Sequence, residues 1–204
     1  MSAEAVEQQP HDDVSLTALA EEIMERHPGY RVEIIGGQIL VTPSPGAPHA
    51  RALTNLVLPF AAAGLHGGET EVLQNVSIWL PDTPDDFATP DLCVVDADID
   101  DHHVERNCYD PVVFRLVLEV TSSNWKTDLQ TKVTAYANAE VPVYVIVDRK
   151  HQRLHVLTDP AEDEYATHRV HAPGEVVALP DSLGAKVTLD VAEILAAGQT
   201  KKNP

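Results

Sequence analysis

The chain has 204 residues, of which 44% are hydrophobic and 23% are charged, values close to the averages of globular domains. This length favours one domain, and the composition excludes collagen-like, coiled-coil and disulfide-rich chains. The 14 basic residues are outnumbered by 32 acidic ones, so the net charge is −18. That charge excludes a general nucleic-acid coat protein, because phosphate binding depends on Lys and Arg.

The negative charge is concentrated in two stretches. Residues 1–25 contain seven acids, residues 82–101 contain eight aspartates, and neither stretch contains Lys or Arg. The rest of the chain is therefore close to neutral and can still form a local basic groove. No stretch reaches the roughly 18 apolar residues of a membrane span, and the N-terminus lacks the pattern of a secretory signal. We expect a cytoplasmic protein without a membrane partner, whose two cysteines stay reduced.

Polar ends flank one predicted domain. Residues 1–13 are acidic and residues 198–204 are basic, and neither carries an apolar pattern, so both are predicted to be disordered tails. Residues 14–197 form the single predicted domain.

Within this domain, the spacing of apolar residues predicts four helices and eight strands. Gly36-Gly37 joins two strands as a hairpin, and Pro59 is expected to bend or shorten the second helix. The predicted helices cover residues 14–27, 49–63, 128–139 and 190–197. The predicted strands cover residues 30–35, 38–41, 71–80, 91–95, 112–120, 143–147, 153–158 and 165–171.

Two of these strands, 112–120 and 143–147, are apolar almost throughout. They fit strands buried on both faces of a sheet, and the helix between them fits a crossover connection. The last two strands form a late hairpin. The predicted fold class is α/β, with a mixed β-sheet flanked by helices, an N-terminal helix and hairpin, and a C-terminal hairpin extension.

Three carboxylates lie at the end or edge of apolar strands: Glu33, Asp91 and Glu119. An ionised carboxylate that leaves water must be paired, bound to a metal or protonated. If adjacent strands gather these acids, a divalent cation would offset their repulsion, and ligands that are all oxygen favour magnesium or manganese. For Glu33 alone, exposure or pairing with an arginine is the favoured interpretation. For Asp91 and Glu119, a shared metal site is the favoured interpretation.

The helix after Glu119 adds a cation to this set. Asp128, Lys132 and Tyr136 recur every four residues and therefore share one helix face. A lysine there could hold a hydroxide or offset charge on a phosphoryl group. From spacing alone, an ordinary Asp–Lys pair beside a half-buried tyrosine is the simpler interpretation.

Zinc is the main alternative metal, because the stretch from Cys93 to Cys108 holds two cysteines and two histidines. The spacing lacks the close pairs of structural zinc sites. We expect a solvated acidic loop with a buried Cys93. The sequence also contains neither a G-x-S-x-G elbow nor a P-loop.

In chain order, three segments carry a family resemblance: YRVEIIGGQILVTPSPGAPH, PDLCVV and LVLEVTSSNWKTDLQTKVTAYANAEVPVYVIVD. Over residues 30–148 the sequence resembles the Uma family of bacterial restriction endonuclease-like proteins, a branch of the PD-(D/E)XK nuclease superfamily. The resemblance implies a restriction endonuclease-like core, in which one helix precedes a small mixed sheet and a second helix crosses between its later strands.

The resemblance also implies the residues of the site. Asp91 matches the family's PD aspartate, Glu119 the acid of its second motif and Glu33 the acid of its first hairpin. The superfamily's usual lysine, two residues after the second acid, is replaced by Thr121. In the Uma-like pattern the lysine comes from the following helix, here as Lys132.

The function implied by the resemblance is metal-assisted hydrolysis of DNA phosphodiester bonds. Asp91, Glu119 and the carbonyl of Val120 would bind magnesium or manganese. Lys132 would orient the nucleophile, and Glu33 would complete the metal shell or act as a base. Nucleases of this general kind often need two sites to cut both strands, so a homodimer is expected by analogy.

Several assignments stay open. His49 matches a histidine that opens the family's first core helix, where a cap or surface group is commoner than a catalyst. Trp79 and Trp125 are predicted as core or loop anchors in preference to base-stacking groups.

The alternative to a nuclease is a catalytically inactive nuclease-fold protein acting as an acidic interaction or regulatory module. The basic residues expected to form a DNA groove are Arg51, Lys126, Lys132, Arg149, Lys150 and Arg153.

Overall fold

The structure is a computed structural model that describes residues 15–122 and 125–199. The predicted tail 1–13 and residues 200–204 lie outside the described residues. The first two residues of the predicted C-terminal tail are described, and their carbonyls accept hydrogen bonds from Arg149 and Arg51. None of the described helices is long and apolar enough to cross a membrane.

The described residues form helices and runs of strands, which agrees with the predicted α/β class. A π-helical turn over Thr127–Thr131, named η3, leads directly into α3. In chain order the helices and strands are α1 (Leu16–Arg26), β1 (Tyr30–Ile35), β2 (Gln38–Pro43), α2 (Ala47–Ala62), β3 (Thr70–Leu73), β4 (Ser77–Trp79), β5 (Phe87–Ala88), β6 (Leu92–Asp96), β7 (Cys108–Tyr109), β8 (Phe114–Val120), α3 (Lys132–Asn138), β9 (Val143–Asp148), β10 (Arg153–Ala161), β11 (Glu164–His171), β12 (Val176–Ala178), β13 (Thr188–Asp190) and α4 (Val191–Ala197).

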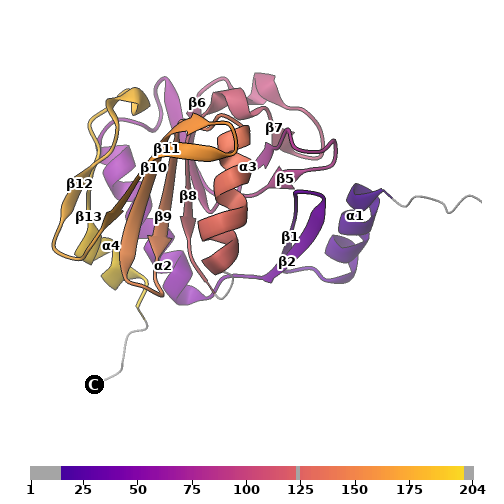
Figure 1. Cartoon of the computed structure of the whole chain (residues 1–204), viewed down its shortest axis with the longest axis horizontal. Helices are drawn as coiled ribbons and strands as arrows, with labels where there is room; N and C mark the ends of the chain where they lie inside the picture. Colours follow the sequence, from indigo (N-terminus) through magenta and orange to yellow (C-terminus); the bar gives the residue numbers. More distant parts are fainter. Residues whose placement is uncertain (1–14, 123–124, 200–204) are drawn as a thin grey trace, which may run out of the picture.

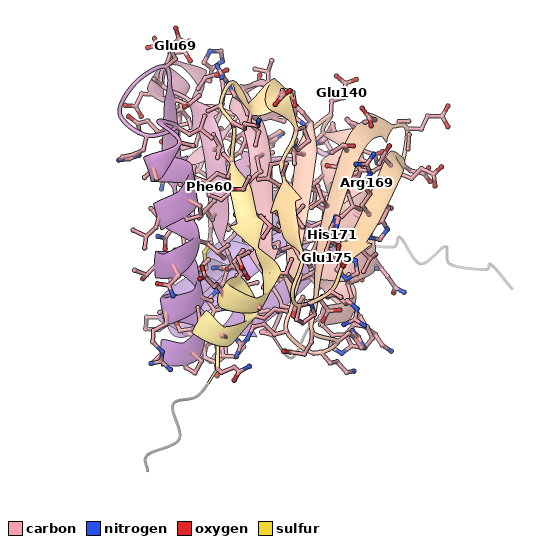
Figure 2. The ribbon with its side chains drawn as sticks, turned by 90° about the vertical axis from the view of Figure 1, so that its left-hand side faces the viewer. Phe60, Glu69, Glu140, Arg169, His171 and Glu175 are labelled. Atoms are coloured by element: carbon pink, nitrogen blue, oxygen red, sulfur yellow. The ribbon has the colours of Figure 1, made fainter. Side chains whose placement is uncertain are left out.

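A six-stranded mixed sheet with the order β11-β10-β9-β8-β6-β3 forms the centre of the fold. Its one parallel pair, β8 with β9, is joined through α3, which confirms the predicted crossover. Helices α2 and α4 and the β12-β13 ribbon cover one face, and α3 covers the other (Figure 1). Figure 2 shows Phe60 of α2 between its helix and the sheet, where it is fully buried.

Alternation along β8 decides which face receives the acid. Leu118 and Val120 belong to the core beneath α2, so Glu119 between them points to the α3 face. Burial on that face leaves only 2% of Glu119 exposed. The same alternation that builds the core therefore places a carboxyl inside the molecule.

A second sheet, with the order β2-β1-β5-β4-β7, lies beside α3 and carries α1 on its other face (Figure 1). Its first two strands form the predicted hairpin, and the turn residues Gly36 and Gly37 adopt φ values of 60° and 68°. Val32 and Ile34 of β1 pack in the core under α1. Arg31 and the next odd-numbered residues of β1 therefore point away from α1 and toward the central layer.

Three predicted elements differ in the structure. The strand predicted over 71–80 is two strands in different sheets, because Asn75 takes a left-handed φ of 57° and turns the chain between them. The strand predicted from residue 112 begins at Phe114, since a 3₁₀ turn precedes it and the Asp110 side chain accepts the Val112 N–H. Pro59 lies inside α2 without ending it.

Asp86 ties the β1-β2 turn to the sheet. Its fully buried carboxylate accepts the N–H groups of Gly36 and Gly37 at 2.6 and 3.1 Å and the hydroxyl of Thr83 at 2.6 Å. Replacing Asp86 by alanine leaves these donors unpaired, and we expect a loss of about 2–4 kcal/mol in the free energy of unfolding. Urea titration measures it. The exposed Asp100→Ala is the matched control, and equal stability of the two variants would contradict the assignment.

Candidate active site

A solvent-open pocket of about 320 Å³ lies where β1, β6, β8 and η3 meet the start of α2. All four residues predicted to be catalytic line it, and Val120 lines it as well. The lining side chains that carry charge or can carry it are Arg31, Glu33, His49, Asp91, Glu119, Asp128, Lys132 and Arg149. The structure thus brings together residues that are far apart in the chain, among them Glu33 and Lys132, which are 99 positions apart.

Lys132 is the centre of the buried polar network. Its ammonium donates to Glu119 Oε1 at 2.7 Å and to Glu33 Oε1 at 2.9 Å. Tyr136, one turn further along α3, donates its hydroxyl to the same Oε1 atom of Glu119 at 3.0 Å. Glu33 also accepts the N–H of Thr89 at 2.7 Å, which fixes β1 against the strand leading to the PD motif. Glu33 is therefore paired with a lysine, and the exposed or arginine-paired alternative for it is wrong.

Asp91 is held by a different set of donors. Its Oδ2 atom accepts the Val120 N–H at 2.9 Å, and its Oδ1 atom accepts a hydrogen bond from Arg31 at 3.0 Å. The Nε2 atom of His49 lies 3.2 Å from Oδ1, in a charge contact whose angle is not that of a hydrogen bond. Burial alone would raise the pKa of Asp91, but His49 and then Arg31 outweigh it and hold the pKa at about 2. Asp91 is therefore ionised.

The pocket contains more negative than positive charge. Four buried carboxyl groups, of Glu33, Asp91, Glu119 and Asp128, share the pocket with three permanent cations, Arg31, Lys132 and Arg149. Because a buried charge needs a partner, this surplus has to be neutralised by protons or by another cation.

The titration of the site reflects this surplus. Burial raises the pKa of Glu119 well above its ordinary range, despite the attraction of Lys132. Burial also raises the pKa of Asp128 to about 7. For Lys132, burial works in the opposite direction, but Glu119 and then Glu33 raise its pKa above the ordinary value and keep the ammonium charged. The acids, and not the lysine, are the groups that exchange protons.

Asp128 owes its position to an unusual helix start. It lies on the π turn η3, and its carbonyl accepts a hydrogen bond from the Tyr144 hydroxyl at 2.8 Å. π turns are rare and are frequent at functional sites. The four-residue spacing of Asp128, Lys132 and Tyr136 indicated a shared face. The ordinary Asp–Lys pair inferred from that spacing is wrong, because Lys132 binds the two glutamates.

The donor set fits a hard divalent cation. Over residues 15–122 and 125–199, no three His, Cys, Asp or Glu side chains are grouped to hold a metal. Two carboxylates, Asp91 and Glu119, remain, with the Val120 carbonyl beside them. Magnesium commonly binds through one or two carboxylates, with water and substrate phosphate completing its shell. In the described chain, Glu119 Oε2 accepts no hydrogen bond, because Lys132 and Tyr136 both bind Oε1.

The predicted basic groove is only partly present at the pocket. Lys132 and Arg149 line it, whereas Arg51 donates to the Gln199 carbonyl instead. Arg153 is exposed at the start of β10 and donates to the Gln152 carbonyl. The other two lysines of the predicted groove, Lys126 and Lys150, gather at Trp125.

Neither cysteine is a reactive thiol at neutral pH. Cys93 is buried as predicted, and Cys108 is buried as well. Burial raises the pKa of the Cys93 thiol to about 12 and that of Cys108 to about 11. Both thiols are therefore protonated and inert at neutral pH.

The mixed sheet with flanking helices and the acid-and-lysine pocket at the carboxyl end of β8 fit a restriction endonuclease-like protein. The chain belongs to the Uma2 family, described as "Putative restriction endonuclease", which matches residues 19–192. The family resemblance of the sequence motifs is thereby confirmed.

The fold also has a counterpart among solved structures. A crystal structure of a "putative nuclease belonging to DUF820" from Anabaena variabilis has a TM-score of 0.64 at 14% sequence identity. The match covers 87% of this chain and 98% of the other. A search of curated proteins finds no match. The family and the fold together support a nuclease-type function.

Proposed function

We propose that the chain is a metal-dependent endonuclease that hydrolyses phosphodiester bonds of DNA. The observation that carries the proposal is the placement of Lys132 against Glu119 in a pocket that also contains the ionised Asp91. A family of restriction endonuclease type and a nuclease-like fold support it. Asp91, Glu119, Lys132 and Glu33 are the residues that we assign to the chemistry.

Asp91, Glu119 and the carbonyl of Val120 would hold magnesium or manganese. When bound, such a cation polarises the phosphate and lowers the pKa of a coordinated water. Its charge would also offset the surplus of carboxylates in the pocket. Because Val120 follows Glu119 directly and its N–H already binds Asp91, the three groups lie on one short stretch of the fold.

The other residues of the network orient the reacting groups and neutralise charge. Lys132 would orient the attacking water and stabilise charge that develops on the phosphate oxygens. Glu33 and the Tyr136 hydroxyl hold Lys132 and Glu119 in place from two directions. Arg31 keeps Asp91 ionised and oriented from β1. Each role requires an ordered network, which the burial of these side chains provides.

Conservative changes of the two acids test the proposal. Asp91→Asn and Glu119→Gln keep the size of each side chain and remove its charge, so we expect at least about a thousandfold loss of magnesium-dependent DNA cleavage. Calorimetry should show manganese binding to the unaltered protein and none to either variant, while circular dichroism stays unchanged. Retained cleavage in both variants, or cleavage that EDTA does not stop, would overturn the proposal. No manganese binding at millimolar metal would favour the inactive interaction module.

A further inference from the structure

We propose that Trp125, with Lys126 and Lys150, forms a subsite for an unpaired nucleotide next to the phosphate held in the pocket. This inference rests on the proposed function and specifies its substrate: DNA with a single-stranded stretch at the cleavage point. None of these three side chains lines the pocket, and none has a role in the chemistry assigned above.

The three residues of the subsite are close in sequence to residues that line the pocket. Thr127 lines the pocket, and Trp125 and Lys126 directly precede it in the helical turn that leads into η3. Arg149 lines the pocket at the end of β9, and Lys150 follows it in the turn toward β10. We expect a nucleic-acid strand that leaves the pocket on the side of Thr127 and Arg149 to meet Lys150 and Trp125 next.

The tryptophan is surrounded by cations. The Nζ atom of Lys150 lies 3.8 Å from the centre of the Trp125 ring, and that of Lys126 lies 5.7 Å from it. His151 approaches the ring edge-on, with ring centres 4.9 Å apart. The indole is only half-buried, and both lysines are exposed. The Lys150 ammonium lies over one face of the indole. In the proposed subsite a base stacks on the indole, and the lysines supply charge for its phosphate.

The two lysines are unusual in so acidic a protein. The net charge is −18, yet neither Lys126 nor Lys150 forms a salt bridge with any acid in the described part of the chain. Their charge is thus available to a phosphate. The predicted anchoring role fits Trp79, which packs against the core beneath α1, whereas Trp125 contributes to none of the three described cores.

The chemistry favours an unpaired base over a duplex. Inside a duplex each base face is covered by its neighbours, so an indole can stack only on a base that has left the stack. Stacking of this kind is tolerant of sequence, because every base has a π-face. The subsite would therefore select single-stranded or locally opened DNA without reading its sequence.

Intrinsic fluorescence tests the subsite directly, because the chain has two tryptophans and only one lies there. In Trp79→Phe, Trp125 is the only tryptophan, and in Trp125→Phe it is Trp79, which lies on β4. Excitation at the red edge of the absorption band selects tryptophan over tyrosine. We titrate both with a 12-nucleotide oligo(dT) in calcium, which takes the same oxygen ligands as magnesium. Saturable quenching is expected in Trp79→Phe and not in Trp125→Phe. No quenching in the first, or equal quenching in both, overturns the proposal.

Further binding measurements test the charge of the subsite, its stacking surface and its preference for unpaired DNA. Lys150→Ala should weaken oligo(dT) binding and reduce the slope of log K against log salt by about 0.7, the value for one phosphate contact on a single strand. Lys186→Ala, an exposed lysine that does not line the pocket, should change neither. Trp125→Ala should raise the Kd at least about fivefold. A matched duplex that competes as well as the single strand overturns the preference for unpaired DNA.

The outcomes separate this inference from the nuclease proposal. Quenching of Trp125 without any DNA cleavage would refute the nuclease and leave the subsite in place. Cleavage of duplex and single strand at equal rates, with no quenching, would refute the subsite and leave the nuclease.

Discussion

Replacing Lys132 by methionine is expected to reduce magnesium-dependent DNA cleavage by at least about a hundredfold, the usual cost of removing one preorganised group that stabilises transition-state charge. Methionine keeps the length and apolar stem of the side chain, so the pocket retains its shape. What disappears is the ammonium that binds Glu33 and Glu119. An assay of plasmid or oligonucleotide cleavage measures the effect.

The same variant should also be less stable. Removing the cation leaves two buried carboxyls without their partner, which typically costs about 3–5 kcal/mol when a buried ion pair loses one member. The loss should be large at pH 8 and smaller at pH 5, because an unpaired buried carboxyl becomes neutral by taking up a proton. Urea titration at the two pH values measures the difference.

Two controls separate chemistry from folding. Lys132→Arg keeps the charge, and it should retain more stability than Lys132→Met while losing activity, because a guanidinium cannot reproduce the point charge of the ammonium. Lys186→Met removes an exposed charge and should leave cleavage and stability unchanged. If Lys132→Met were as active as the unaltered protein, Lys132 could not have the role that we assign to it.

The main architecture could be predicted from the sequence because the pattern of apolar residues in a long segment indicates which of its residues are buried. Residues 143–147 are apolar in every position, and β9 is buried along its whole length. The hairpin of β1 and β2 was equally predictable, since Gly36-Gly37 supplies the positive φ values that its turn requires. The short strands β5 and β7, with two residues each, offer no period to detect.

The polar network was harder to predict because its contacts are long-range. The motifs pointed to Glu33, Asp91, Glu119 and Lys132, and all four line one pocket. Nothing in the spacing indicated that Lys132 would bind Glu33, 99 residues away, in preference to Asp128 on its own helix. That choice depends on how the two sheets meet.

The aspartate-rich stretch 82–101 illustrates the same limit. It reads as uniformly acidic, yet Asp86 is a buried clamp for the β1-β2 turn and Asp91 is a buried site residue. Asp100 and Asp101 are exposed on a 3₁₀ turn. Composition cannot separate these roles, because each depends on donors from elsewhere in the chain.

Asp128→Asn is expected to stabilise the metal-free protein more at pH 8 than at pH 5. Burial raises the pKa of Asp128 to about 7, from 3.8 when unfolded. Between these values the folded state holds the proton and the unfolded state does not, so the contribution of this group falls as the pH rises from about 4 to about 7. The maximum loss is about 4 kcal/mol, at 1.36 kcal/mol for each pKa unit.

Asparagine cannot ionise, so the variant escapes this loss, and its stability relative to the unaltered protein should increase by about 2–4 kcal/mol between pH 5 and pH 8. Taking the difference between the two proteins largely cancels the titration of the other groups. Asp100→Asn, at an exposed position, is the matched control and should show no such increase. A pH-independent difference would mean that Asp128 is not the proton acceptor of the pocket. Magnesium should reduce the gain, because a cation that neutralises the acid surplus lowers the pKa of Asp128 and removes the cost that asparagine avoids.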